Sequence, residues 1–292
     1  YRGVSFWSNP YTTGVYATGN ELYDCIISNA SSRTYAIYYG GGAIHVGGQD
    51  GMKIYNNVIS STSRTAGNNG NIFSTYSKGW NRGIKYYNNK SYTLESNGTE
   101  WNFHIEEWNS YGGWEIYDNE FYGGGCYIDI AGSTNIKGAY DYSFYIHDNL
   151  FERDGTQPYN ASRESVGIAI EGATADVIIT KNHFKYQQFG VKQALGADTL
   201  NQERIYVYYN IFENIGLTNN NWSAGVMIIP GVLDTLRHIY YENNVFTASA
   251  SSASGGVGVL FQYSNTSGAS VENINFRNNI IQGFTTAPIW LY

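Results

Sequence analysis

The hexapeptide Ile54-Tyr55-Asn56-Asn57-Val58-Ile59 recurs along the chain, with an apolar residue three positions before and two positions after a shared asparagine. The further copies are Ile116–Phe121, Ile146–Phe151, Ile179–Phe184, Val207–Phe212, Tyr241–Phe246 and Phe276–Ile281. A degenerate copy surrounds Asn89, and Leu22–Ile27 carries Cys25 in the asparagine position. Nine copies at intervals of 28 to 35 residues set a nearly constant period, which indicates a repeat architecture.

Each interval also holds a second apolar segment, for example Ala43-Ile44-His45-Val46, in which apolar residues tend to alternate as they do in half-buried strands. Stacked repeats of this kind bury a continuous core and pair every strand with its neighbours. Asparagine suits one corner of each turn, because it tolerates the left-handed backbone conformation and its amide can bond the equivalent corner one rung away. We therefore predict an all-β chain that forms a single right-handed parallel β-helix over residues 1–292, with about nine or more rungs (turns of the helix) and irregular loops.

Two other repeat folds fit less well. The blades of a β-propeller repeat at about 40–50 residues, which is longer than the intervals here. A leucine-rich repeat has a compatible length, but its leucine ladder is absent from the sequence. The two cysteines, Cys25 and Cys126, lie several rungs apart in the predicted register, so we expect small buried thiols and no disulfide.

Composition and charge narrow the class of partner. A hydrophobic fraction of 42% provides for a substantial core, while 17 basic residues are scattered among 24 acidic ones. Nucleic-acid binding needs clustered Lys and Arg, and an acidic balance argues against an anionic membrane surface. No apolar run approaches the roughly 18 residues that span a bilayer. We therefore expect a neutral partner, no nucleic acid and no membrane insertion.

The repeats also predict which side chains point outward. If the apolar residue three positions before the corner asparagine faces the core, the residue two positions before it faces solvent. Tyrosine is concentrated at this position and two residues earlier on the same face, and the outward tyrosines are Tyr55, Tyr87, Tyr117, Tyr145, Tyr206, Tyr208 and Tyr240. Such rows stabilise an exposed sheet, or they form a flat aromatic platform on which sugar rings stack. Two rungs span about 9.5 Å, comparable to the cellobiose repeat of a cellulose chain.

Tryptophans add to this surface. Trp80, Trp101, Trp108 and Trp114 crowd into the third and fourth repeats, and Trp222 lies in a polar loop. Any one of them can plug a loop against the helix, but five together favour a ligand surface.

The second strand of each repeat supplies a catalytic alternative. His45, His104 and Asp129 each lie between two apolar residues, which predicts an outward column. The charged residues expected near them are Glu106, Glu171 and Lys192. A histidine and a carboxylate on adjacent rungs suit general acid–base catalysis, and Glu106, Asp129 and Glu171 suit glycosidase carboxylate pairs. A long β-helix also aligns some polar residues by chance, and the sequence lacks the paired-Asp and Gly-His-Gly signatures of polygalacturonase-like hydrolases.

The repeats Ile54–Ile59 and Ile116–Phe121 resemble those of the right-handed parallel β-helix superfamily. Among its members, this Tyr- and Trp-rich chain of low charge is similar to the C-terminal domain of the tāpirins, surface adhesins by which thermophilic plant-biomass-degrading bacteria attach to cellulose. The resemblance implies a non-catalytic cellulose-binding domain at the extracellular cell surface. Because the chain begins with Tyr1 and ends in a strand-like pattern at Tyr292, we expect a piece of a longer secreted protein.

The leading hypothesis is therefore a monomeric adhesin domain that holds insoluble polysaccharide, above all cellulose, through the aromatic residues named above. We expect no cofactor, and a structural calcium ion at the acidic corners Asp118 and Asp148 stays open. The alternative is a polysaccharide lyase or glycoside hydrolase that uses His104, Asp129, Glu171 or Lys192. A third hypothesis is a structural repeat without a ligand of its own.

Overall fold

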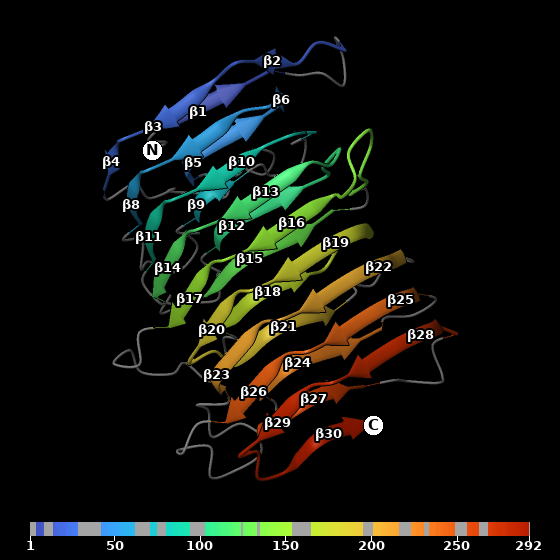
Figure 1. Cartoon of the computed structure of the whole chain (residues 1–292). Coiled ribbons are helices and arrows are strands. Elements are labelled where there is room, and N and C mark those ends of the chain that lie inside the picture. The colour runs from blue at the N-terminus through green and yellow to red at the C-terminus, as the bar shows by residue number, and fades with distance from the viewer. Residues whose placement is uncertain are drawn as a thin grey trace.

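The computed structural model describes residues 4–8, 14–28, 42–61, 71–74, 80–93, 103–123, 125–132, 135–153, 165–194, 201–215, 223–230, 234–248, 256–262 and 268–291. Over these residues the chain is all β. Its strands pair in parallel into three long sheets, and within each sheet the strands follow one another along the axis of the helix (Figure 1). The prediction of an all-β parallel β-helix is confirmed. None of the described segments forms a helix long and apolar enough to cross a membrane.

Sheet 1 contains the second apolar segment of each repeat. Its strands are β1 (Val4–Trp7), β5 (Gly42–Gly47), β9 (Asn71–Ser74), β12 (Phe103–Trp108), β15 (Cys126–Ala131), β18 (Val166–Ile170), β21 (Phe189–Ala194), β24 (Ser223–Ile229), β27 (Gly256–Phe261) and β30 (Ala287–Leu291).

Sheets 2 and 3 lie on either side of the asparagine corner. Sheet 2 consists of β3 (Glu21–Tyr23), β7 (Lys53–Tyr55), β10 (Lys85–Tyr87), β13 (Trp114–Tyr117), β16 (Phe144–His147), β19 (Thr174–Thr180), β22 (Asn201–Tyr208), β25 (Thr235–Glu242) and β28 (Ser270–Arg277). Sheet 3 consists of β4 (Ile26–Ile27), β8 (Val58–Ser61), β11 (Lys90–Thr93), β14 (Glu120–Gly123), β17 (Leu150–Arg153), β20 (His183–Lys185), β23 (Ile211–Ile215), β26 (Val245–Ala248) and β29 (Ile280–Gln282). A short pair, β2 (Ala17–Thr18) and β6 (Gln49–Asp50), lies beside the first rungs.

The repeated hexapeptide is a bend between two strands. In the second rung β7 ends at Tyr55 and β8 begins at Val58, and Asn56 between them has a left-handed φ of 57°. The left-handed residue is therefore the one before the shared asparagine, and not that asparagine as its conformational tolerance suggested. Sheet 3 is a third wall that the sequence had not separated from sheet 2.

The shared asparagines form a buried hydrogen-bonded ladder through the corner. Asn57 Nδ2 donates to Asn89 Oδ1 at 2.9 Å, and Asn89 Nδ2 donates to Asn119 Oδ1 at 3.2 Å. The same contact continues through Asn149, Asn182, Asn210, Asn244 and Asn279. Each amide also bonds the backbone, as Asn119 does with the carbonyl of Tyr86 at 2.9 Å. The expected rung-to-rung amide bond is confirmed, and it explains why this position repeats.

Stacked columns of apolar side chains fill the interior. The rings of Phe121, Phe151, Phe184, Phe212 and Phe246 stack along sheet 3 with centroids 4.5 to 5.0 Å apart. Glycines in sheet 1 make room for them: a Cβ on Gly190 would lie 2.2 Å from the ring of Phe212. Sheet 2 contributes buried residues such as Ile54 and Ile116, three positions before the corner asparagine, as predicted.

Candidate binding surfaces

A column of stacked rings runs along the outer face of sheet 2 in its first five rungs. Tyr23, Tyr55, Tyr87, Tyr117 and His147 follow one another with centroids 5.0 to 5.1 Å apart and ring planes 2° to 7° apart. We call these five residues the tyrosine ladder. The parallel register aligns the same position of each strand, which brings one ring directly over the next.

The ladder is not the flat platform that the sequence suggested. Coplanar rings side by side cannot approach to 5.0 Å without overlap of their edges, so the faces of neighbouring rings overlap in an offset stack. The faces of the inner rings contact neighbouring rings, and their edges and hydroxyl groups are the parts exposed to solvent. The outward direction of Tyr55, Tyr87 and Tyr117 is confirmed. Each of these three rings is stacked on both sides, so none of them has a face exposed for stacking on a sugar.

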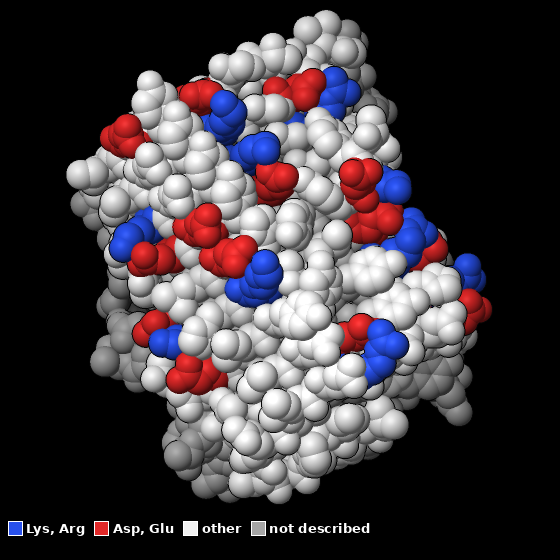
Figure 2. All heavy atoms as spheres, in the orientation of Figure 1, with Lys and Arg blue, Asp and Glu red and all other residues white. Residues whose placement is uncertain are grey.

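Charged side chains beside the ladder neutralise one another. Lys53 Nζ lies 2.8 Å from Glu21, and Lys85 Nζ lies 2.6 Å from Glu115. Tyr55 Oη donates to Glu21 at 3.1 Å, and partial desolvation together with this bond raises the pKa of Tyr55 to about 12. Figure 2 shows acidic and basic side chains adjacent to one another over this face. The surface therefore suits a neutral ligand better than a charged one.

The other predicted tyrosines lie on the same sheet but outside the ladder. Tyr145 packs against His147, with centroids 4.1 Å apart. Tyr206 and Tyr240 form a separate stacked pair at 5.2 Å in two later rungs, and Tyr208 lies edge-on to Tyr209. Tyr206 and Tyr240 thus stack on each other and not on the ladder, whereas Tyr145 contacts its last ring.

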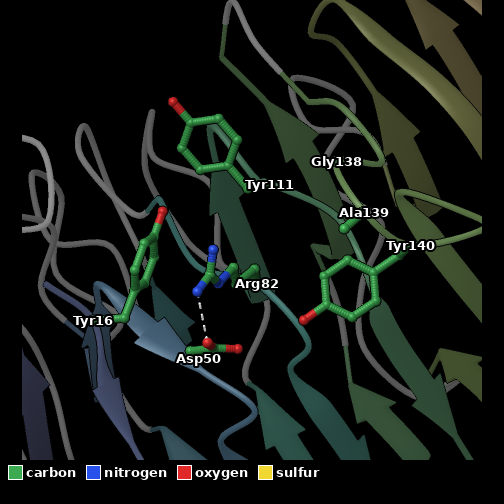
Figure 3. Close-up of a pocket in the computed structure, with 7 residues that line it drawn as sticks. All are labelled: Tyr16, Asp50, Arg82, Tyr111, Gly138, Ala139 and Tyr140. Atoms are coloured by element: carbon green, nitrogen blue, oxygen red, sulfur yellow. Dashed lines mark hydrogen bonds and ion pairs between the residues drawn. The ribbon is translucent and has the colours of Figure 1, made fainter. Parts of the chain in front are cut away.

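A pocket of about 450 Å³ lies in the segments that precede the five strands of the ladder (Figure 3). Its lining comprises Tyr16, Asp50, Arg82, Tyr111, Gly138, Ala139 and Tyr140. Arg82 lies in the middle of these groups: its Nη2 is 2.8 Å from Asp50 Oδ2, and its guanidinium lies 4.1 Å from the centre of the Tyr16 ring. The three tyrosine rings surround this ion pair, and the cavity combines aromatic surface with paired polar groups.

Neighbouring residues hold two of the rings in place. Tyr111 stacks on Trp80, with centroids 5.0 Å apart, so one face of Tyr111 is supported from behind. Tyr140 lies against Gly113, where φ is 70° and a Cβ would come within 2.4 Å of the ring. Only glycine combines that conformation with that close approach. Burial and the charge of Asp50 raise the pKa of Tyr140, so its hydroxyl stays protonated as a hydrogen-bond donor.

None of the residues that line this pocket was predicted from the sequence; Trp80, which was, only supports Tyr111 from behind. Its members come from five different repeats, and none of them belongs to the repeated hexapeptide. Their spacing carries a signal nevertheless: Asp50 and Arg82 both precede a ladder tyrosine by five residues, Tyr111 precedes one by six, and Tyr16 and Tyr140 precede ladder residues by seven.

The predicted tryptophans have different surroundings. Trp114 is wholly buried in β13 and packs on Phe144, so its assignment to an exposed binding surface is wrong; β13 alternates, and Trp114 lies on the same inward side as Ile116. Trp108 is half-buried, and its Nε1 donates to Glu106 at 3.0 Å. Trp101 and Trp222 lie outside the described residues.

His104 is not on an outward column, which corrects the catalytic alternative. It is fully buried, its ring stacks on Tyr127, and its two nitrogens bond the hydroxyls of Ser91 at 2.6 Å and Thr93 at 3.0 Å. Burial lowers the pKa of His104 to about 3. The physical reason is a corner in β12, where two consecutive residues, His104 and Ile105, both face the core.

The remaining candidates lie together on the outer face of sheet 1. Glu106 and Asp129 are register partners in β12 and β15, and Lys192 stands two strands further along the same column. Glu171 directly follows β18. We call Glu106, Asp129, Glu171 and Lys192 the carboxylate cluster. Burial, and then the charges of Glu171 and Glu106, raise the pKa of Asp129 well above its ordinary value.

The two cysteines and the carboxylates at the corners form neither a disulfide nor a metal site among the described residues. Both thiols are free; Cys126 is buried and Cys25 is half-buried at the end of the asparagine ladder. Asp118 and Asp148 take left-handed backbone conformations at exposed corners. Among the described residues no group of three or more His, Cys, Asp or Glu side chains is arranged to hold a metal ion.

Comparison with known proteins shows no family for the chain. No protein-family model matches it, and no curated protein matches its sequence. Among solved structures the chain is similar to PfbA, a surface adhesin of Streptococcus pneumoniae, at 10% sequence identity and a TM-score of 0.28, with 86% of this chain and 84% of that chain covered. A likeness this distant carries no argument about function, so membership of the tāpirins and cellulose binding stay predictions.

Proposed function

We propose that this chain is an extracellular polysaccharide-binding domain that attaches its bearer to an insoluble neutral glycan, above all cellulose. The binding surface is the pocket of Tyr16, Tyr111 and Tyr140 together with the hydroxyl edge of the tyrosine ladder in the same five rungs.

The observation that carries the proposal is the pocket. A volume of about 450 Å³ lies within the range of small-ligand sites, which are largely apolar with a few polar groups that fix orientation. Tyrosine rings pack on the CH-rich faces of hexose units, and their hydroxyls bond sugar hydroxyls. Arg82 and Asp50 offer donors and acceptors to the ligand while they cancel each other's charge.

The ladder extends this surface along the chain axis. From Tyr23 to His147 it covers five rungs, a length of about 19 Å at the usual spacing between strands. Phenol hydroxyls along that line can bond successive sugar units of a chain whose end or branch enters the pocket. Weak contacts repeated over a rigid surface suit a long polymer, because they add up without ordering the protein further.

Binding to microcrystalline cellulose tests the proposal directly. We expect the protein to be depleted from solution in low and in molar salt, because neutral contacts are not screened. Xylan and mannan in parallel samples identify the preferred glycan. A protein that stays wholly in the supernatant with all of these polymers contradicts the proposed function.

A further inference from the structure

The carboxylate cluster lies on sheet 1, a different wall of the helix from the binding surface on sheet 2. Parallel register pairs Glu106 with Asp129 on adjacent strands, whose backbones are about 4.8 Å apart. Both side chains point away from the core, since the neighbouring Ile105 and Ile128 face it. Their carboxyl groups therefore stand side by side at roughly the 5 Å separation that double-displacement glycosidases use.

Asp129 is buried without a partner for one of its oxygens. The residue is only 3% exposed, and no described group bonds Oδ1. Apolar residues of the same outer face, including Cys126, Ala169 and Met227, form a packed cluster around this column. Burial of a polar group without a hydrogen bond costs about 1–3 kcal/mol of folding free energy. The position of Asp129 therefore does not serve the stability of the fold. Glu171, which is exposed, lies at the solvent side of the cluster.

Asp129 is the partner that holds a proton. Burial and the charges of Glu171 and Glu106 raise the pKa of Asp129, against the opposing charge of Lys192, so Asp129 keeps its proton. Glu106 accepts a hydrogen bond from Trp108 Nε1 at 3.0 Å. A carboxyl group that keeps its proton is suited to act as the acid, with the neighbouring carboxyl group as its partner in one reaction.

We propose that Glu106 and Asp129 form a glycoside hydrolase site for a neutral polysaccharide. The cluster contains more acidic side chains than basic ones, since only Lys192 is positively charged, so binding of an anionic uronate chain is disfavoured. In the first step the Glu106 carboxylate bonds the anomeric carbon, the glycosidic C–O bond breaks, and its electron pair takes the proton of Asp129. In the second step the Asp129 carboxylate removes a proton from water, whose oxygen displaces Glu106. One water is consumed, and both side chains return to their starting states.

The test is release of reducing ends from swollen cellulose, mixed-linkage β-glucan and xyloglucan. We expect release from at least one of them, with a 10²- to 10⁴-fold loss of rate in Asp129→Asn. Asp118→Asn is the matched control, because Asn56 and Asn88 occupy the same corner in other rungs, and it keeps the full rate. Glu106→Ala is expected to release no reducing ends. Added azide, which takes the place of the missing nucleophile, should restore cleavage of the chain with a glycosyl azide as the product, measured as shortening of the polymer.

No reducing ends from any of the three polymers overturns the proposal. An Asp129→Asn variant as active as Asp118→Asn also overturns it. The rate should fall as pH rises through the raised pKa of Asp129, and Glu106, Glu171, Lys192 and Cys126 are the titratable groups facing it. Binding to cellulose through sheet 2 is independent of these variants, so failure of one proposal is distinguishable from failure of the other.

Discussion

The rings of Tyr55 and Tyr87 form an offset stack, with centroids 5.0 Å apart and planes 5° apart. This contact gives the tyrosine ladder a structural role, because each inner ring shields its neighbours from water. Tyr111 in the pocket differs: its one ring partner among the described contacts is Trp80, on a single side. The two groups of tyrosines should therefore respond differently to substitution.

Tyr87→Ala should lower stability more than it lowers glycan affinity. The substitution removes stacking on both Tyr55 and Tyr117, and cross-strand aromatic pairs contribute roughly 0.2–1 kcal/mol each. We expect the free energy of unfolding in urea to fall by about 1 kcal/mol. Tyr92→Ala, which has one stacked partner in Tyr122, is the control and should cost about half as much. Equal stability of Tyr87→Ala and the unaltered protein would show that the ladder is not structural.

Asn119→Ala should be strongly destabilising. Its amide accepts from the backbone N–H of Asn89 and donates to the carbonyls of Tyr86 and Tyr117, all at 2.9 Å. Each buried group left without a partner costs about 1–3 kcal/mol, so we expect a loss of at least about 3 kcal/mol. Urea titration measures it, with exposed Asn275→Ala as the control. A loss no larger than that of the control would refute the ladder's role in holding the corner.

His104 should make stability depend on pH in one direction. Its pKa is about 3 in the folded protein and near 6.5 when unfolded. The unfolded chain therefore binds a proton that the folded chain rejects, and this contribution to stability is lost as pH falls below 6.5. Relative to pH 7.5, the loss at pH 5 should be about 2 kcal/mol.

The variant His104→Gln isolates that contribution. It keeps polar atoms near Ser91 and Thr93 but cannot take up the proton. Its free energy of unfolding should therefore fall less than that of the unaltered protein between pH 7.5 and pH 5. The same fall in both proteins would mean that His104 is not the group responsible.

Much of the fold follows from local patterns. The asparagine spacing fixes the rungs, and the apolar residue three positions before each asparagine fixes which side of sheet 2 faces the core, as Ile54 and Ile116 show. The direction of the His104 side chain could not be predicted in this way. In β12 the alternation of inward and outward side chains is interrupted at His104 and Ile105, which both face the core. The aligned position holds glycine in later strands, such as Gly190 and Gly225, where a Cβ would meet a core phenylalanine. That glycine column was the available sign that His104 and Tyr127 point inward.

The candidate sites were harder to predict for a different reason. Tyr16, Arg82 and Tyr140 are separated by dozens of residues and lie in segments without the repeated motif, so only the stacking of rungs brings them together. Trp114 was misplaced because tryptophan content alone carries no information on side-chain direction. Glu106 was only expected near Asp129, because the sequence aligned His104 with Asp129; the register of the strands in the structure makes Glu106 its direct neighbour.

Binding isotherms on microcrystalline cellulose test the central claim most directly. Tyr111→Ala and Tyr140→Ala each remove a pocket ring, whereas Tyr206→Ala and Tyr240→Ala remove rings from the stacked pair in later rungs. With folding checked by thermal unfolding, we predict about tenfold weaker binding or more for each pocket variant and unchanged binding for the other two. Pocket variants that bind like the unaltered protein, or an equal loss in all four, would contradict the account.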